Sequence, residues 1–337
     1  ERGVRVVVYG VGAMGAIVTR LLVEKGAEIV GAIGRSPDKV GRDLGDVAGL
    51  DNRLGVTVEA DPQRVLSRGA DIAVVCVGSY LDNMRGHFAD CLEHGVNVVT
   101  IEEETVFPWT TAPDHAAALD ALAKVNSVTL AASGAQDVFW LNQVTTLLGA
   151  SHRVDRVAGR CVWNVDDYGP EVANHLFVGQ SRDVFEEHVA NKGWPEFVAR
   201  QTLEAMLASL HLTVKSMRSV VKPVLANVPV LCRSLGVEVQ PDHVIGTIDR
   251  TEITTEEGPE FAFEMKGCVY GADDADINYW QVYGEPDMEL KNNGVSYRFT
   301  TCSTLVNRIP DVIRAKPGLL SLDKMGPPGY QHGRLRI

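Results

Sequence analysis

Three glycines near the start of the chain have the spacing of a turn that binds the pyrophosphate of a dinucleotide. They follow a run of β-branched residues and precede a stretch with helical period, so they lie between a strand and a helix. In such a turn the first glycine permits a tight bend, the second lets backbone N–H groups approach the phosphates, and the third brings the helix close to the strand. The helix N-terminus adds unpaired donors and partial positive charge. We therefore expect a bound dinucleotide, rather than an empty glycine-rich turn, at Gly10, Val11, Gly12, Ala13, Met14 and Gly15.

The residues after the second expected strand indicate which nicotinamide dinucleotide is used. In an NAD site, an acidic residue about 20 residues beyond the glycines binds the ribose hydroxyls. Here Arg35 and Ser36 occupy that tip, with Lys39 just beyond, and an arginine beside a hydroxyl suits a 2′-phosphate. This pattern favours NADP. The alternative is that Arg35 and Lys39 are solvated loop charges, and Asp38 nearby would support some use of NAD.

Other strand ends carry residues that could take part in a reaction, because ligands of open α/β sheets bind beyond the carboxyl ends of the strands. Gly78 and Ser79 follow the fourth strand and could face the nicotinamide ribose. The fifth strand runs into three adjacent carboxylates at residues 102–104. A partly desolvated carboxylate there could hold a cation or move a proton, whereas the alternative is a solvated loop. Aromatic side chains farther along could line an apolar pocket or belong to an ordinary core: Phe139, Trp140 and Tyr168.

The first part of the chain alternates between expected strands and helices, which predicts a doubly wound parallel sheet. Several strands are continuous apolar runs, as strands buried on both faces require. The expected strands cover residues 4–9, 28–33, 56–59, 72–77, 96–100 and 127–131, with helices at 81–94 and 114–124. We therefore predict an α/β protein whose Rossmann dinucleotide-binding domain covers residues 1–134 and is completed by residues 301–337.

The pattern changes after about residue 134. Strand-like runs cover residues 153–163, 243–255, 261–270 and 277–283, and helical periods cover 135–148 and 195–221. These predict an α+β domain over residues 135–300 with a largely antiparallel sheet and helices on one face. We expect it to bind substrate and to form a dimer. A last helix at 301–315, stopped by Pro317, is expected to dock back on the first domain.

Composition excludes several classes of protein. The net charge of −12 argues against nucleic acid or an anionic membrane as partner, and no apolar run approaches the ~20 residues of a membrane span. The expected strand begins too early for a signal peptide to precede it. The six cysteines include no CxxC pair and predict thiols in a reducing compartment, hence a cytoplasmic protein. The histidines lack metal-ligand spacing, so no metal site is expected.

Several motifs together resemble the native amine dehydrogenases and the related diaminopentanoate dehydrogenases, which share their cofactor domain with dihydrodipicolinate reductase. The resemblance covers nearly the whole chain, and the HHxxK-type motif of the reductases themselves is missing. The glutamate run before an aromatic-Pro-Trp and the QDxFW segment are the specific parts. The matching segments are GVGAMG at 10–15, IEEETVFPW at 101–109, SGAQDVFW at 133–140, NVDDYGP at 164–170 and VNRIPDVI at 306–313.

The resemblance implies roles for individual residues. The essential glutamate of the family falls on Glu103, with Glu104 as the alternative if the alignment slips by one residue. Trp140 and Tyr168 match pocket residues, and Asn307 is placed to meet the nicotinamide carboxamide. A homodimer is implied as well.

The implied reaction is reversible reductive amination of a small ketone or aldehyde by ammonia and NADPH, which gives a primary amine. A diamino-acid dehydrogenase is the first alternative, and it would need a cation for the substrate carboxylate. Arg160 or Arg298 could supply that cation, but we expect both to be surface charges of the sheet, and we therefore favour a simple ketone or amine as substrate. A non-catalytic NADP-binding sensor is the alternative of another class.

Overall fold

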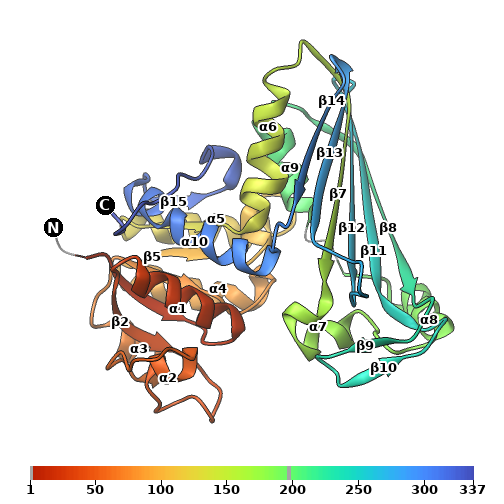
Figure 1. Cartoon of the computed structure of the whole chain (residues 1–337). Helices are drawn as coiled ribbons and strands as arrows, with labels where there is room; N and C mark the ends of the chain where they lie inside the picture. Colours follow the sequence, from red (N-terminus) through yellow and green to blue (C-terminus); the bar gives the residue numbers. More distant parts are fainter. Residues whose placement is uncertain (1–2, 196–198) are drawn as a thin grey trace. The chain divides into compact units, whose positions relative to one another are not determined.

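The computed structural model describes residues 3–195 and 199–337. The chain divides into two compact units. Unit 1 comprises residues 1–138 and 299–337, and unit 2 comprises residues 139–298. The chain therefore passes from one unit to the other twice (Figure 1).

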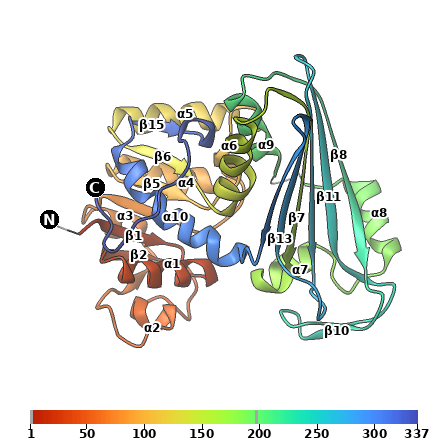
Figure 2. The same ribbon diagram turned by 45° about the horizontal axis from the view of Figure 1, so that its top comes forward.

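Unit 1 contains a seven-stranded sheet in the order β15-β6-β5-β4-β1-β2-β3, and every described strand pair in it is parallel. The α/β Rossmann architecture expected from the sequence is thus confirmed. Figure 2 shows β15 beside β6, where the last strand of the chain forms an edge of the sheet. The elements are β1 (Arg5–Tyr9), α1 (Ala13–Glu24), β2 (Glu28–Ile33), α2 (Leu44–Ala48), β3 (Val58–Glu59), α3 (Pro62–Leu66), β4 (Ile72–Val75), α4 (Leu81–Glu93), β5 (Asn97–Thr100), η1 (Glu104–Val106), α5 (Pro113–Val125), β6 (Thr129–Ala132), α10 (Tyr297–Arg314), β15 (Gly318–Leu320) and η4 (Leu322–Lys324).

Successive residues of β1, an interior strand, pack into two separate cores, because side chains of a strand alternate between its faces. Val6 and Val8 of β1 pack in a cluster with Val18 of α1 and Ile309 of α10. Val7 lies in a second cluster, with residues of α3, α4 and α5. Helices on both faces bury most of the sheet, which is why the interior residues of strands such as β1 and β4 are apolar.

Unit 2 contains a six-stranded sheet in the order β14-β13-β7-β12-β11-β8, which is antiparallel except for the parallel pair β7–β12. This confirms the expected largely antiparallel sheet. The elements are η2 (Asp137–Asn142), which starts in unit 1, then α6 (Gln143–Leu148), β7 (Arg153–Asn164), η3 (Val165–Tyr168), α7 (Pro170–His175), α8 (Arg182–Lys192), α9 (Ala199–Ser209), β8 (Val214–Leu225), β9 (Val230–Cys232), β10 (Val237–Val239), β11 (Val244–Thr255), β12 (Glu260–Cys268), β13 (Ile277–Glu285) and β14 (Met288–Asn293).

Two helical expectations need correction. The helix expected over residues 195–221 is limited to α9, because residues 214–221 belong to the edge strand β8; residues 196–198 lie outside the described part of the chain. The helix expected over 135–148 is not uniform, because residues 137–142 form a π-helix, whose wider turn carries hydrogen bonds five residues apart.

Within residues 3–195 and 199–337, the structure has no helix that is both long and apolar enough to span a membrane.

Candidate active site

The glycine turn of unit 1 is shaped to admit a phosphate group. Gly10 has φ +102°, and a Cβ on Gly15 would lie 2.0 Å from the Gly10 carbonyl oxygen, so both positions require glycine. A Cβ on Gly12 would instead meet no atom within 4 Å. Gly12 is the N-cap residue of α1, and no side chain accepts a hydrogen bond from the first backbone N–H groups of that helix. These N–H groups can therefore bind a phosphate. The turn therefore fits a dinucleotide pyrophosphate.

The charged residues beyond β2 lie close to this turn. Lys39 Nζ donates a hydrogen bond to the Val11 carbonyl at 3.1 Å. Ser36 donates to the carboxylate of Asp38, a bond that lowers the pKa of Asp38. The Arg35 side chain is exposed. Beyond β2, the chain thus presents the guanidinium of Arg35, the ammonium of Lys39 and the hydroxyl of Ser36, with the carboxylate of Asp38 among them. These are the groups expected to distinguish the 2′-phosphate of NADP from the ribose hydroxyl of NAD.

The three consecutive glutamates after β5 have different surroundings. Glu102 is fully buried and accepts hydrogen bonds from the backbone N–H groups of Glu104 (2.7 Å) and Thr105 (2.9 Å), and from the Thr105 hydroxyl. Burial raises the pKa of Glu102 to about 8, although these three bonds favour the ionised form. Glu102 therefore holds the short helix η1 in place.

Glu104 caps helix α4, which precedes it in the chain. Its Oε2 accepts the backbone N–H of Leu81, the first residue of α4, at 2.7 Å. A carboxylate at a helix N-terminus satisfies an orphan donor and interacts favourably with the helix dipole. This attachment occupies one Glu104 oxygen and links η1 to α4.

Glu103 lies between these two capping residues and has a free oxygen. Its Oε2 is buried and has no hydrogen-bond partner among the described residues. Burial raises the pKa of Glu103 to about 7, against the opposing effect of hydrogen bonds from its own backbone and from the Ser79 side chain. A carboxyl group with a pKa near neutrality can both accept and return a proton at physiological pH. The contact with Ser79 also joins two of the strand ends that the sequence singled out.

The aromatic residues expected in the pocket belong to unit 2. Trp140 packs against Phe263 at a ring-centroid distance of 5.2 Å and against Tyr297 at 6.0 Å. Phe139 meets the same Tyr297 edge-on at 6.2 Å. Tyr168 packs edge-on against Trp163 at 5.2 Å. Phe139 and Trp140 therefore share one aromatic cluster, and Tyr168 lies in a separate pair.

Asn307 has a partner in the C-terminal tail of the chain. Its Oδ1 accepts the backbone N–H of Gln331 at 3.4 Å. On the same helix, Cys302 Sγ contacts the carbonyl of Met14 at 3.7 Å, so the start of α10 borders the glycine turn. A contact between Asn307 and the nicotinamide stays a prediction.

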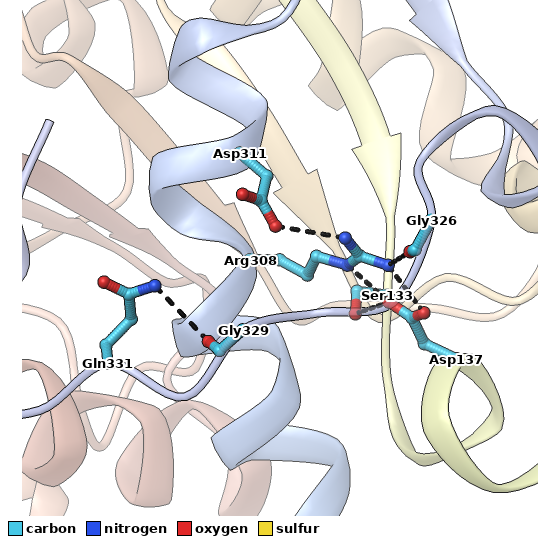
Figure 3. Close-up of polar contacts among 7 residues, drawn as sticks. All are labelled: Ser133, Asp137, Arg308, Asp311, Gly326, Gly329 and Gln331. Carbon is cyan, nitrogen blue, oxygen red and sulfur yellow. Dashed lines mark hydrogen bonds and ion pairs between the residues drawn. The ribbon is translucent and has the colours of Figure 1, made fainter. Parts of the chain in front are cut away.

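A buried ion pair fixes the start of the QDxFW segment. Asp137 and Arg308 are both fully buried, and the guanidinium binds the carboxylate through Nε at 2.7 Å and Nη2 at 2.8 Å (Figure 3). Ser133 donates to the same carboxylate at 2.8 Å, and Arg308 also binds Asp311 and the Gly326 carbonyl. Burial alone would lower the pKa of Arg308, but the bonds to the two carboxylates raise it. The pair attaches α10 and the tail to the π-helix.

The sequence did not single out Arg308 or Asn278, and it left the surroundings of two candidate cations, Arg160 and Arg298, open. Asn278 of β13 lies on the buried face of its strand together with Trp280. The sequence signal that could have revealed it is a polar residue among the apolar residues of that face. Arg298 was interpreted as a possible surface charge of the sheet, but it lies in the first turn of α10, and its Nε is buried without a hydrogen-bond partner among the described residues. Arg160, the other candidate cation, is exposed on β7.

No group of three or more metal-ligating side chains is found among residues 3–195 and 199–337. All six cysteines are free thiols.

Comparisons with known proteins point to one family. The sequence profile described as the 2,4-diaminopentanoate dehydrogenase C-terminal domain matches residues 139–335. The 2,4-diaminopentanoate dehydrogenase of Acetoanaerobium sticklandii is 25% identical over 352 aligned residues, covering 99% of this chain and 96% of that protein.

Solved structures give the same picture. The amine dehydrogenase from Mycobacterium smegmatis is 46% identical, with a TM-score of 0.94 and 99% coverage of both chains. GenD2 from gentamicin A biosynthesis, solved with NAD, is 14% identical with a TM-score of 0.60 and covers 96% of this chain and 90% of its own; this likeness concerns the fold alone.

Proposed function

This chain belongs to the 2,4-diaminopentanoate dehydrogenase C-terminal domain family, and from that premise we propose that it is an NADPH-dependent amine dehydrogenase for small ketones or aldehydes. The expected family resemblance is confirmed. Membership, and 46% identity to an amine dehydrogenase over the full chain, make it an NAD(P)-dependent oxidoreductase acting on CH–NH2 groups. The reaction joins a carbonyl compound to ammonia and reduces the product to a primary amine.

The free oxygen of Glu103 carries the assignment of the base. Ammonia is mostly ammonium at neutral pH, so the site must attract the cation and remove a proton before nitrogen can attack the carbonyl carbon. A buried carboxyl with pKa about 7 can do both. The resulting carbinolamine loses water to give an iminium, which a carboxylate and aromatic faces stabilise, the latter by ~0.5–2 kcal/mol. A nicotinamide dinucleotide held at the glycine turn, Gly10–Gly15, would supply the hydride for reduction of the iminium carbon.

The protein positions these groups through separate elements. The glycine turn at Gly12 accommodates the pyrophosphate, and Gly78 with Ser79 leads from β4 towards Glu103. Glu104 acts through its hold on α4. Phe139, Trp140 and Tyr168 line the apolar side of the substrate pocket in this proposal.

Steady-state kinetics test the proposed reaction. We expect NADPH oxidation only when ammonia and a small ketone or aldehyde are both present. Glu103→Gln should abolish amination and leave NADPH binding within about twofold of wild type. Equal turnover without ammonia would make the protein a carbonyl reductase, and tight NADPH binding without turnover on a broad amine panel would favour the non-catalytic sensor.

The preference for NADP over NAD is part of the proposal. Arg35, Ser36 and Lys39 supply donors for a 2′-phosphate, while the exposed Asp38 is available to ribose hydroxyls. Arg35→Ala should raise the KM for NADPH at least tenfold and change the KM for NADH little. Equal effects on both cofactors would contradict the assignment of Arg35.

A diamino acid is the second candidate substrate. The family profile and the Acetoanaerobium relative favour it, as does the buried Nε of Arg298, which lies near enough to Asp167 to lower the pKa of that carboxyl against the larger effect of burial. Arg298 could bind a substrate carboxylate. A comparison of 2,4-diaminopentanoate with cyclohexylamine distinguishes the two candidates, because Arg298→Met should impair only the first.

A homodimer and a cytoplasmic location complete the proposal. The face of the unit 2 sheet opposite Phe263 carries charges of alternating sign, and one example is the cross-strand row of exposed Arg160 with half-buried Glu264 and Arg250. A surface that alternates in this way can pair with its own copy about a twofold axis. Six free thiols are in keeping with a reducing compartment.

A further inference from the structure

The side chain of Asn278 is the centre of a polar network beneath the aromatic residues of unit 2. Its side chain is fully buried. Nδ2 donates to the Phe139 carbonyl and to Asn292 Oδ1, both at 2.9 Å, and Oδ1 accepts from Trp280 Nε1 at 3.0 Å. Both amide hydrogens and the amide oxygen are therefore in use, and only an amide can make this set of bonds.

The bond to the Phe139 carbonyl holds the π-helix at the residue that begins the aromatic surface. Residues 137–142 form this single wide turn, and π-turns recur at functional sites. The turn is fixed at its first residue by the Asp137–Arg308 ion pair. Asn278 fixes it again two residues later, so the directions of Phe139 and Trp140 are set on both sides.

The bond to Trp280 supports the same surface from behind. Trp280 is fully buried and stacks on Phe263 at 5.0 Å with an interplanar angle of 26°, and Phe263 packs against Trp140. A Cβ on Gly159 would lie 2.4 Å from the Trp280 ring, so the neighbouring strand provides space for this indole. The position of Trp280 is thus defined by its N–H bond and by the space above Gly159.

We propose that Asn278 is a positioning residue that sets the size of substrate the enzyme accepts. We define the aromatic wall as Phe139, Trp140, Phe263 and Tyr297. The amide of Asn278 holds this wall through two hydrogen bonds, one to the Phe139 carbonyl and one to Trp280, which stacks on Phe263. The inference rests on the proposed function, because it assigns the aromatic wall to the apolar part of a ketone. It adds a residue that touches neither substrate nor cofactor.

Asn278→Asp is the direct test. The variant keeps the shape and the acceptor for Trp280, but it turns an oxygen towards the Phe139 carbonyl and Asn292 Oδ1, which repels both. For a series of ketones of increasing size, at saturating NADPH and ammonia, we expect KM to rise at least tenfold. The ratio of kcat/KM between the largest and smallest ketone should also change at least tenfold. The Kd for NADPH should stay within twofold.

Asn292→Ala is the matched control, because it removes one bond of Asn278 and leaves those to Phe139 and Trp280. It should keep the size profile of wild type. If Asn278→Asp does not fold, Trp280→Phe takes its place, since it removes the indole donor and should shift the profile in the same direction. An unchanged profile in a folded Asn278→Asp or Trp280→Phe variant, judged by near-UV circular dichroism, would overturn the inference. A wild type without ammonia-dependent turnover would overturn the proposed function instead.

Discussion

At the scale of single residues, the glutamate run shows how neighbours of one type acquire different tasks. Glu102 and Glu104 each accept backbone N–H groups, and Glu103 retains a buried oxygen without a partner among the described residues. Burial raises the pKa of both Glu102 and Glu103, to about 8 and about 7, so the difference between them is the free oxygen of Glu103. The local hydrogen bonds, more than the sequence position, therefore select the residue fit for proton transfer.

The two alternative bases can be separated by stability and activity. Glu104→Ala leaves the Leu81 N–H without its acceptor and should lower the free energy of unfolding by about 0.5–2 kcal/mol, with Glu104→Gln restoring most of it. Amination should persist in both. Chemical denaturation and ammonia-dependent NADPH oxidation measure the two effects. Loss of amination in Glu104→Gln, with Glu103→Gln active, would exchange the two roles.

The pH dependence of stability should reveal the buried Glu103. Its folded-state pKa, about 7, lies above the ordinary value of 4.5, so its contribution to stability is complete below pH 4.5 and is lost as pH rises through 7. The free energy of unfolding of wild type should thus fall relative to Glu103→Gln between pH 5 and pH 8, by up to about 3 kcal/mol. Denaturation curves at several pH values measure this. Parallel curves for the two proteins would show that Glu103 titrates normally.

The second and third glycines of the turn should respond differently to alanine. A Cβ at Gly12 meets no protein atom, so Gly12→Ala should fold normally and weaken NADPH binding at least tenfold, because the methyl group takes the space of the pyrophosphate. Gly15→Ala should fail to fold stably, because its Cβ meets the Gly10 carbonyl oxygen. Thermal melts and fluorescence titration with NADPH separate the cases. Unimpaired NADPH binding by Gly12→Ala would argue against this site.

At the scale of elements, the Asp137–Arg308 pair fastens the π-helix to α10. Removal of one partner from a buried ion pair leaves an unpaired charge, which usually costs about 3–5 kcal/mol, whereas apolar replacement of both can be neutral. The ion pair thus joins two elements that are remote in sequence, in addition to the ring contacts of Phe139 and Trp140 with Tyr297.

A double-mutant cycle should show the energetic coupling within the pair. Asp137→Leu and Arg308→Met should each lower the free energy of unfolding by about 3–5 kcal/mol, and the double variant should be more stable than either single variant. Urea denaturation measures the free energy of unfolding of the two single variants and the double variant relative to wild type. Additive losses would mean that the two side chains do not interact energetically.

The parts of the fold and of the candidate site that depend on local sequence could be predicted. The parts that depend on long-range contacts could not. The glycine turn and the parallel strands could be predicted because the residues that determine each of them are adjacent in the sequence. The π-helix was not, since residues 137–142 also fit an ordinary helix. Strand β8 was missed because an edge strand exposes charges such as Lys215 and Lys222. The tasks of Glu102 and Glu104 depend on partners brought near by folding, among them Leu81, which no local pattern reveals.

At the scale of the whole molecule, the charged face of the unit 2 sheet is the expected dimer surface. Arg250 forms ion pairs with Glu252 at 3.0 Å and with Glu264 at 3.6 Å, both on this face. Exposed hydrophobic residues such as Val220 and Tyr283 lie on it as well. In a homodimer, the second copy would cover the exposed side chains of Val220 and Tyr283 on this face.

Charge reversal at the exposed Arg160 tests the dimer. Arg160→Glu places a carboxylate opposite Glu264 in the cross-strand row and should weaken self-association at least tenfold, while the monomer remains folded. Sedimentation velocity gives the oligomeric state, and Lys192→Glu, on helix α8, is the control. A monomeric wild type, or an Arg160→Glu dimer of unchanged affinity, would contradict the assigned surface.

The discontinuity of unit 1 also bears on how the protein is made. Val18 and Leu22 of α1 pack with Leu305, Val306 and Ile309 of α10, which the ribosome delivers only after all of unit 2. During synthesis, the apolar face of α1 therefore stays exposed to solvent while residues 139–298 are translated. Ribosome-bound chains arrested near residue 140 should accordingly recruit chaperones, and the affinity for dinucleotide should arise only at the end of translation.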